Sequence, residues 1–381
     1  MPVHSNKCDV LVVGGGPAGL ATAIALRQCG ADVLLADAQA PPIDKACGEG
    51  IMPDSRRDLA QLGIQLPASC GAEFRGIRFC NPRSSVFAAF PSERGLGVRR
   101  TVLHRILADH AAAVGVRLAW KTSVDSTPGR PIAIDGQAAR YKFLIGADGQ
   151  TSRVRPWAGL DQGSLLSRRF GFRTHYRAAV PILHSASRNV EVHWAPAGQA
   201  YVTPVDDDEV CVAIMTRFPD GLRSQNIVAS IPELRDRLAG AEIISRQRGA
   251  ITTTRRLKHI TRGNVALVGD ASGSADAITG EGLAMAFRQA RLLANAIQRD
   301  DLSLYEHQHP FVMRLPQTMA RLMLLMDRWP LLQDRALRVL ASDPMLFQTM
   351  LHVHIGEKPL RHFLLRQAPS LGLRLLLPLH A

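Results

Sequence analysis

A glycine-rich turn between an apolar strand and a helix is the feature that most constrains this fold. Residues 8–13, CDVLVV, form a short apolar run of the kind found in buried parallel strands. GGGPAG follows at 14–19 and opens a helical pattern that continues to Gly30, and the next strand, ADVLLAD, ends at Asp37. A strand, a glycine-rich turn, a helix and a second strand with a terminal acid predict a βαβ unit that binds a dinucleotide.

Each glycine of the turn has its own physical task. Gly14 permits the tight turn, Gly16 lets the backbone approach a pyrophosphate, and Gly19 lets the helix pack closely on the strand. The helix N-terminus stabilises the phosphate charge, and the acid of the second strand accepts ribose hydroxyls. The cofactor-binding residues predicted from this unit are Gly14, Gly16, Pro17, Ala18, Gly19 and Asp37.

Two later segments place an acid at the end of an apolar strand. Residues 141–149, YKFLIGADG, end in Asp148 and Gly149. Residues 264–282, NVALVGDASGSADAITGEG, contain Gly269 and Asp270 and lead into a helix. In open α/β sheets ligands bind at the carboxyl ends of the strands, so both segments are predicted to converge on the same ligand as the first turn.

Together the three motifs resemble the FAD-dependent hydroxylase and geranylgeranyl-reductase superfamily, the p-hydroxybenzoate hydroxylase-like flavoproteins, from residue 8 to about residue 300. The resemblance implies an α/β fold: a Rossmann-like FAD-binding domain, an antiparallel-sheet substrate domain and a C-terminal helical region. In that family the acid matching Asp270 contacts the ribityl chain of FAD, and the Asp148–Gly149 motif supports the cofactor region. The turn containing Gly280 and Gly282 presents backbone N–H groups to the flavin.

Two further segments acquire a place from the resemblance. Arg100, in GVRRTVLHRIL, is placed near the FAD phosphates, although His104 stands where the family usually has Asp. In the geranylgeranyl-reductase branch a loop similar to DKACGEG, residues 44–50, runs along the isoalloxazine, which implies flavin contacts for Ala46, Cys47 and Gly48. Cys47 is either a small apolar filler or a thiol tuned for proton transfer. Lys45 and Glu49 are interpreted as solvated loop charges, or else as charges that line the cavity.

The order of these segments predicts a divided chain. The FAD-binding domain takes residues 1–78, 98–160 and 258–300, the substrate domain takes 79–97 and 161–257, and the helical region takes 301–381. Alternating strands in the substrate domain suit an antiparallel sheet that forms one wall of the cavity. The predicted catalytic residues are Cys47, His193 and Tyr201.

The last region is rich in Leu, Met and Arg at helical spacing, and prolines are predicted to separate its helices. It forms either a helical subdomain packed on the sheet, or a basic, Met-rich surface that meets lipid or a long-chain substrate. The net charge of +13 favours polyanionic partners. A nucleic-acid partner is not expected, because aromatic residues are only 5% and no nucleic-acid motif occurs.

Other features concern the compartment. No apolar run reaches the ~20 residues of a membrane span, and MPVHSNK lacks the layout of a signal peptide. The six cysteines are scattered and form no metal-ligand set. We therefore expect a cytoplasmic protein without a metal, which the basic C-terminal helices could also place at the membrane surface.

For function, the resemblance implies an FAD-dependent monooxygenase of secondary metabolism. It would hydroxylate an aromatic, phenolic or lipid-like small molecule with O2 through a flavin C4a-hydroperoxide. No second dinucleotide fingerprint occurs, so NAD(P)H would dock transiently. The alternative is a geranylgeranyl reductase-like reductase of isoprenoid or lipid double bonds. A flavin-dependent halogenase is disfavoured because Trp-x-Trp-x-Ile-Pro is absent, and intact FAD motifs argue against a non-enzymatic lipid-escort protein.

Overall fold

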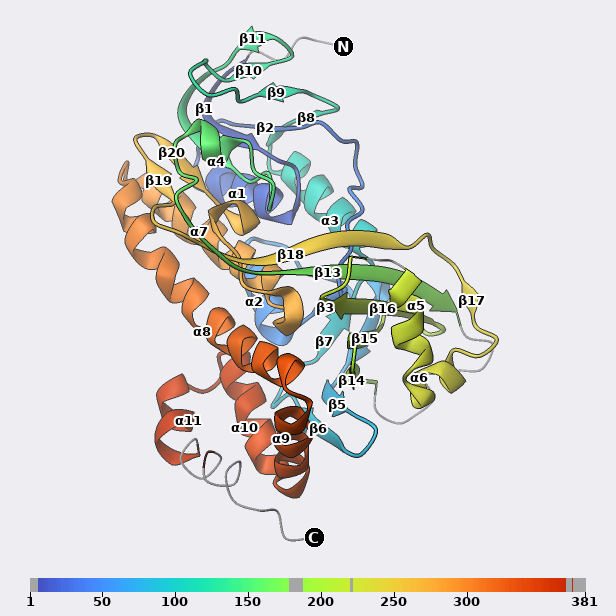
Figure 1. Cartoon of the computed structure of the whole chain (residues 1–381). Coiled ribbons are helices and arrows are strands. Elements are labelled where there is room, and N and C mark those ends of the chain that lie inside the picture. Colours follow the sequence, from blue (N-terminus) through green and yellow to red (C-terminus); the bar gives the residue numbers. More distant parts are fainter. Residues whose placement is uncertain (1–5, 178–187, 220–221, 368–371, 373–381) are drawn as a thin grey trace.

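A computed structural model describes residues 6–177, 188–219, 222–367 and 372 of the chain. The apolar segment at 371–381, predicted to be helical, lies outside the described residues apart from residue 372. Figure 1 shows a parallel sheet with its helices at one end, a second and larger sheet beside it, and the C-terminal helices at the other end. This is the mixed α/β architecture predicted from the sequence.

The first sheet has six strands in the order β19-β20-β12-β1-β2-β8. β1 pairs in parallel with β2 and β12, and β12 pairs in parallel with β20, so these strands end at one edge. The strand bounds are β1 Lys7–Val13, β2 Val33–Asp37, β8 Arg117–Trp120, β12 Arg140–Gly146, β19 Thr261–Arg262 and β20 Val265–Leu267. A small sheet joins β9 (Val124–Asp125), β10 (Ala133–Ile134) and β11 (Gln137–Ala138).

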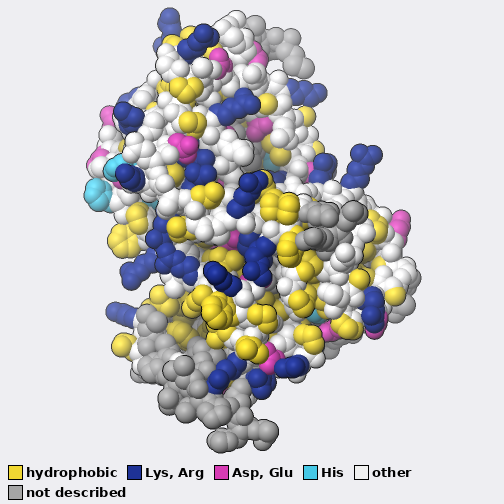
Figure 2. Space-filling view, in the orientation of Figure 1, with side chains coloured by type: hydrophobic (Ala, Val, Ile, Leu, Met, Phe, Trp, Pro, Cys, Tyr) yellow, Lys and Arg dark blue, Asp and Glu magenta, His cyan; other side chains and the backbone are white. Residues whose placement is uncertain are grey.

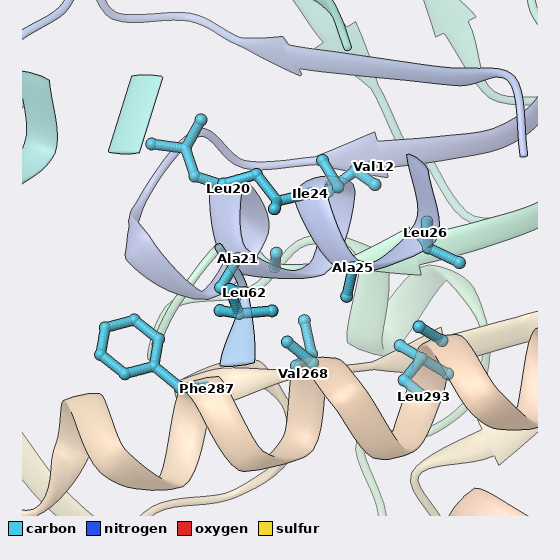
Figure 3. Packing of buried hydrophobic residues seen from close by; sticks show 14 of the residues in the cluster. Val12, Leu20, Ala21, Ile24, Ala25, Leu26, Leu62, Val268, Phe287 and Leu293 are labelled. Atoms are coloured by element: carbon cyan, nitrogen blue, oxygen red, sulfur yellow. The ribbon is translucent and has the colours of Figure 1, made fainter. Parts of the chain in front are cut away.

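Helix α1 is held between this sheet and helix α7. Leu20 and Ile24 of α1 are fully buried with Val12 of β1, and Phe287 and Leu293 of α7 belong to the same core cluster (Figure 3). Parallel strands covered on their faces read as continuous apolar runs, which is why CDVLVV carries little alternation. The helices of this half are α1 Pro17–Gln28, α2 Pro53–Gln61, α3 Arg100–Ala113, α4 Val154–Trp157 and α7 Gly282–Gln298.

The second sheet has eight strands in the order β17-β13-β16-β15-β14-β5-β6, with β18 paired to β13. All its pairs are antiparallel except β5 with β14, which is parallel. The bounds are β5 Gly76–Cys80, β6 Ser85–Ala89, β13 Gly163–Arg177, β14 Val190–Ala195, β15 Gly198–Pro204, β16 Glu209–Thr216, β17 Glu242–Ile243 and β18 Arg248–Leu257. Short elements complete this part: β3 Gly50–Ile51, β4 Ala72–Phe74, β7 Gly95–Gly97, α5 Leu222–Ala229 and α6 Pro232–Arg237.

The C-terminal region is helical, with α8 Leu302–Arg328, α9 Pro330–Ser342, α10 Pro344–His354 and α11 Leu360–Arg366. Pro330 and Pro344 start helices, where a missing N–H has no cost. Pro310 and Pro316 instead lie inside α8, so the prediction that prolines separate the helices is wrong at these two positions. Among the described residues, no helix is long and apolar enough to span a bilayer.

Candidate flavin site

One cavity of about 770 Å³ is formed where the carboxyl edge of the parallel sheet meets the larger sheet. Of the residues predicted to bind the cofactor, those lining this cavity are Gly14, Gly16, Pro17, Ala18, Asp37, Ala46, Cys47, Gly48, Arg100, Asp148, Gly149, Gly269, Asp270, Gly280 and Gly282. Gly19 is not among them, because it lies beneath the turn. A Cβ there would be 1.8 Å from the Gly14 carbonyl oxygen.

The first turn is held open toward the cavity by the chain around it. Gly14 has φ +112°, and a Cβ at that position would lie 2.4 Å from the Ala147 carbonyl oxygen. Gly16 has no atom within 4 Å of the place where a Cβ would stand, so the cavity side of the turn is free to receive ligand atoms. Asp37 accepts the Gly15 N–H at 2.6 Å, which fixes the acid beside the turn.

His104 supports the same turn from helix α3. Its Nε2–H donates to the Gly15 carbonyl at 2.8 Å. Burial lowers the pKa of His104, so the ring stays neutral. A neutral imidazole with its hydrogen on Nε2 can make this bond. The histidine found where the resembling family has Asp therefore has a structural task at the phosphate turn.

The DKACGEG loop crosses the cavity between the two sheets. Cys47 lines it, and the Sγ of this cysteine accepts the Glu49 N–H at 3.4 Å. Lys45 is half exposed and lies 3.7 Å from Asp270. Glu49 is only 2% exposed and also lines the cavity, so its interpretation as a solvated charge is wrong and the alternative holds.

The second and third segments are tied together by Arg155, which the sequence did not point to. Asp148 accepts the backbone N–H groups of Arg153 and Val154 at 2.7 and 3.1 Å and so begins α4. The buried Arg155 donates to the carbonyls of Gln150 and Ala271 at 3.1 and 3.3 Å. Arg155 therefore joins the Asp148 loop to the loop that follows β20.

The Gly269–Asp270 turn rests on two helices. Gln289 of α7 accepts the Gly269 N–H at 2.7 Å. Ser272 donates to the Gly269 carbonyl at 2.8 Å, and its Oγ lies 2.9 Å from Nε2 of His309 on α8, which accepts from the Gln289 amide at 3.1 Å. Burial lowers the pKa of His309 to about 4, so this ring is neutral and accepts. A histidine in a helix remote along the chain gave no sequence signal for this role.

The next turn, before α7, is fixed by a buried ion pair. Asp276 accepts the Ile278 N–H at 3.1 Å and lies 3.3 Å from Arg169 of β13. Arg169 also bonds to Gln199, which in turn donates to Asp327 of α8. The turn that carries Gly280 is therefore held in place by hydrogen bonds and ion pairs to the larger sheet and, through Gln199, to the C-terminal region.

Of the three residues predicted to be catalytic, two line the cavity and one does not. Tyr201 of β15 lines the cavity, where its hydroxyl donates to the Ile278 carbonyl at 2.8 Å and burial raises its pKa. Cys47 lines the cavity as well. His193 lies on the opposite face of its strand from the cavity-lining Val192, and its Nε2 is 2.8 Å from Glu191. We therefore withdraw His193 as a catalytic residue.

Beyond the flavin loops the cavity continues into the C-terminal helices. The side chains that line this extension are almost all apolar: Met319, Leu322, Met323, Met326, Leu340, Phe347, Met350 and Leu351. His354 of α10 lines it as well, and its Nδ1 lies 3.7 Å from the buried Glu281. Burial raises the pKa of Glu281, neither of whose carboxylate oxygens has a hydrogen-bond partner.

These features define a class of protein: a dinucleotide-binding protein whose cavity opens at the carboxyl edge of the parallel sheet. Gly16, Gly48, Gly280 and Gly282 leave open space where a side chain would stand, and they surround one cavity together with Asp37. Residues 7–299 match the FAD binding domain family, and the chain belongs to that family. The protein is an FAD-dependent oxidoreductase.

Known proteins similar to this chain include two reductases. Digeranylgeranylglycerophospholipid reductase of Methanocella arvoryzae is 26% identical over 321 residues, which cover 78% of this chain and 80% of that protein. Menaquinone reductase of Mycolicibacterium smegmatis is 25% identical over 336 residues, 81% of each chain. The crystal structure of a flavoprotein/dehydrogenase from Cytophaga hutchinsonii superposes with a TM-score of 0.81 at 18% identity, covering 97% of this chain and 98% of that one.

Proposed function

We propose that this enzyme reduces carbon–carbon double bonds in an isoprenoid or similar long-chain lipid. The observation that carries the proposal is the apolar extension of the cavity, which leads away from the flavin loops between α8, α9 and α10. Methionines at Met319, Met323, Met326 and Met350 suit this use, because their flexible thioethers adapt to a long, bendable chain. The similarity to two reductases, one of them acting on a phospholipid by its name, supports the same reaction.

In this proposal the bound FAD supplies the hydride, and the chain supplies binding, orientation and exclusion of water. The glycine turns would hold the cofactor through backbone N–H groups, and the cavity-lining Asp37 and Asp270 would accept its hydroxyls. Val192 and Tyr201 line the sheet side of the cavity, and the Met-rich helices line the other. Two groups that carry a proton line the cavity, the Cys47 thiol on the DKACGEG loop and the Tyr201 hydroxyl on β15. We propose that both face the substrate.

The test is an anaerobic reaction of reduced enzyme with a lipid. Protein loaded with FAD is reduced with one equivalent of dithionite and mixed with geranylgeranyl-chain lipids that carry no quinone ring. Reoxidation of the flavin together with a product heavier by two hydrogens, seen by mass spectrometry, is the expected result. A reduced flavin that persists with every prenyl lipid, while the same protein is reoxidised by air, would overturn the proposal.

A second candidate is the monooxygenase predicted from the sequence, acting on an aromatic ring with an apolar tail. The apolar lining favours it as well, because oxygen transfer needs a cavity that excludes water. NADPH- or NADH-driven O2 uptake that rises when a long-chain phenol is added would support this reaction. Strict dependence of product formation on O2 separates it from the reductase.

The apolar extension predicts how chain length governs turnover. Met323→Trp narrows the extension at α8, whereas the loops around the flavin are untouched. We expect kcat/KM to fall at least about tenfold for a twenty-carbon prenyl substrate and to change little for a five- or ten-carbon one. The matched control is Met345→Trp in α10. The Met345 side chain is 67% exposed and does not line the cavity. Equal losses for short and long substrates would contradict the placement of the tail.

The membrane contact suggested by the sequence is also part of the proposal. Leu322 both lines the cavity and is exposed, so the extension reaches the surface at α8. Figure 2 shows hydrophobic side chains gathered over the C-terminal end of α8, with Lys and Arg side chains beside them. A lipid substrate could enter at this point directly from a bilayer.

A further inference from the structure

A buried chain of hydrogen bonds runs from the protein surface to the cavity wall behind the DKACGEG loop. Ser245 Oγ lies 2.9 Å from Nδ1 of His175, and Nε2 of His175 lies 2.7 Å from Glu49 Oε2. Ser245 is partly exposed and lines a separate surface hollow, whereas His175 and Glu49 are buried and Glu49 lines the flavin cavity. The three side chains therefore connect solvent with the site.

The neighbours of His175 fix which of its nitrogens carries the proton. Nη1 of Arg173 lies 3.1 Å from Nδ1, and a guanidinium N–H can only donate, so Nδ1 accepts. Nε2 then carries the hydrogen and donates it to Glu49. An imidazole that accepts on the solvent side and donates on the cavity side is arranged to pass protons inward.

Glu49 is held in place by contacts that a solvated loop charge would not have. Its Oε1 accepts the Arg100 backbone N–H at 2.9 Å and lies 3.8 Å from Nε of Arg173. Its backbone φ of +59° is uncommon for a residue other than glycine. A left-handed glutamate in this loop points its carboxylate at His175 instead of into water, so the backbone conformation serves the contact.

The charges around the chain come from several elements. Arg173 also bonds to Asp44, and Asp44 accepts from Arg248 of β18 at 3.1 Å. The Sγ of Cys211 on β16 lies within 4.8 Å of a Glu49 carboxylate oxygen and a His175 ring nitrogen. Burial raises the pKa of Cys211, so this thiol stays protonated. Arg99, Arg177, Glu209, Glu242 and Arg246 surround the hollow at Ser245.

We propose that Ser245, His175 and Glu49 carry protons from solvent to the cavity during the reaction. Water gives a proton to the Ser245 hydroxyl as that hydroxyl's own proton moves to Nδ1. The Nε2 proton then passes to Glu49, whose carboxyl releases one proton to the acceptor in the cavity. One proton enters and one leaves, and His175 is left with its hydrogen on Nδ1. A half-turn of the ring then brings the N–H back toward Glu49 and restores the starting arrangement before the next turnover. This role rests on the proposed redox function, since adding two hydrogens to a double bond takes one proton with each hydride.

The experiment measures proton movement without any lipid substrate, so it can be interpreted even if the proposed substrate is wrong. FAD-loaded protein is reduced with the methyl viologen radical, whose oxidation releases no proton, in weak buffer containing a pH indicator, and proton uptake is timed against flavin bleaching. We expect uptake to keep pace with bleaching in the wild type and to lag at least tenfold in His175→Gln and Glu49→Gln. Added imidazole should restore the rate in His175→Gln.

The matched control is His193→Gln, which removes another buried histidine bonded to a glutamate, on the face of the sheet away from the cavity. Its uptake should equal that of the wild type. Nitrogen-15 NMR of the FAD-free protein should show the Nε2–H form of His175, and this form should persist in Ser245→Ala because Arg173 still donates to Nδ1. Proton uptake unchanged in His175→Gln, with lowered thermal stability alone, would overturn the relay and leave only a structural role.

Discussion

Two glycines of the first turn do different things although they are two positions apart. Gly14 has a left-handed φ and sits against the Ala147 carbonyl, so its lack of a side chain is needed for folding. Gly16 has φ −69° and ψ 177°, which any residue adopts, and it faces open cavity. Its lack of a side chain is needed by the ligand and not by the fold.

This difference predicts opposite outcomes for alanine. Gly14→Ala should lower the free energy of unfolding by at least about 2 kcal/mol, since it adds strain and a clash with backbone. Gly16→Ala should cost about 1 kcal/mol or less in the FAD-free protein but weaken FAD binding at least about tenfold. Urea unfolding of the apoprotein and flavin titration measure the two quantities. Loss of stability without loss of FAD affinity in Gly16→Ala would contradict the placement of the pyrophosphate.

At the residue scale the sequence predicts backbone roles better than side-chain partners. The glycines and acids of the three motifs depend on local geometry, and their spacing placed them around one cavity. Glu49 and His193 depend on contacts with residues far away in the chain. Strand alternation separates His193 from Val192, but which face turns toward the cavity is decided by how the two sheets meet.

At the scale of elements, helix α8 connects the flavin loops to the C-terminal region. It carries His309 beneath Ser272, Asp327 beside the Gln199 amide, and Met319 in the cavity. The sequence predicts a helical region here, but the two prolines in α8 suggested breaks that do not occur. Tertiary contacts on both sides of α8 outweigh the lost backbone hydrogen bonds, and a single sequence does not reveal such contacts.

The buried His309 predicts a pH dependence of stability. Its pKa is about 4 in the folded protein and about 6.5 in an unfolded chain, so the unfolded state takes up the proton first as pH falls. Stability from this group is complete above pH 6.5 and is lost between about pH 6.5 and 4. At pH 5 the loss is about 2 kcal/mol relative to pH 7.5.

Comparison with His309→Gln isolates this effect, because the amide oxygen can still accept from the Gln289 amide but does not titrate. Urea unfolding of both proteins at pH 7.5 and pH 5 gives the difference in stability at each pH. We expect the advantage of the wild type to shrink by about 2 kcal/mol at the lower pH. A difference that stays constant would mean that the ring is already protonated, or solvated, in the folded protein.

At the scale of the whole molecule, the cavity lies between parts that come from distant stretches of the chain. The parallel sheet supplies the cofactor turns, the larger sheet supplies Tyr201 and Arg169, and the C-terminal helices supply the apolar extension. The cavity is therefore complete only when all three parts have packed. The Leu- and Met-rich composition after residue 300 already suggested a surface for a long chain, but only the packing of α8, α9 and α10 makes that surface an extension of the flavin cavity.

The exposed side of the C-terminal helices predicts binding to anionic membranes. Leu325 of α8 and Trp329, which lies between α8 and α9, are 48% and 59% exposed, and the exposed Arg321 and Arg328 lie on α8. Each arginine near an anionic bilayer contributes about 1 kcal/mol, and burial of each large apolar side chain adds about 1.5–3 kcal/mol.

The wild type should therefore sediment with phosphatidylglycerol vesicles at low salt and much less with phosphatidylcholine vesicles. The double variant Leu325→Ser/Trp329→Ser should bind at least about tenfold more weakly. Ile243→Ser, which removes an equally exposed apolar side chain from β17, should bind like the wild type. Equal weakening by both variants would show that association is a general response to lost apolar surface, and the lipid would then have to reach the extension from solution or from a carrier.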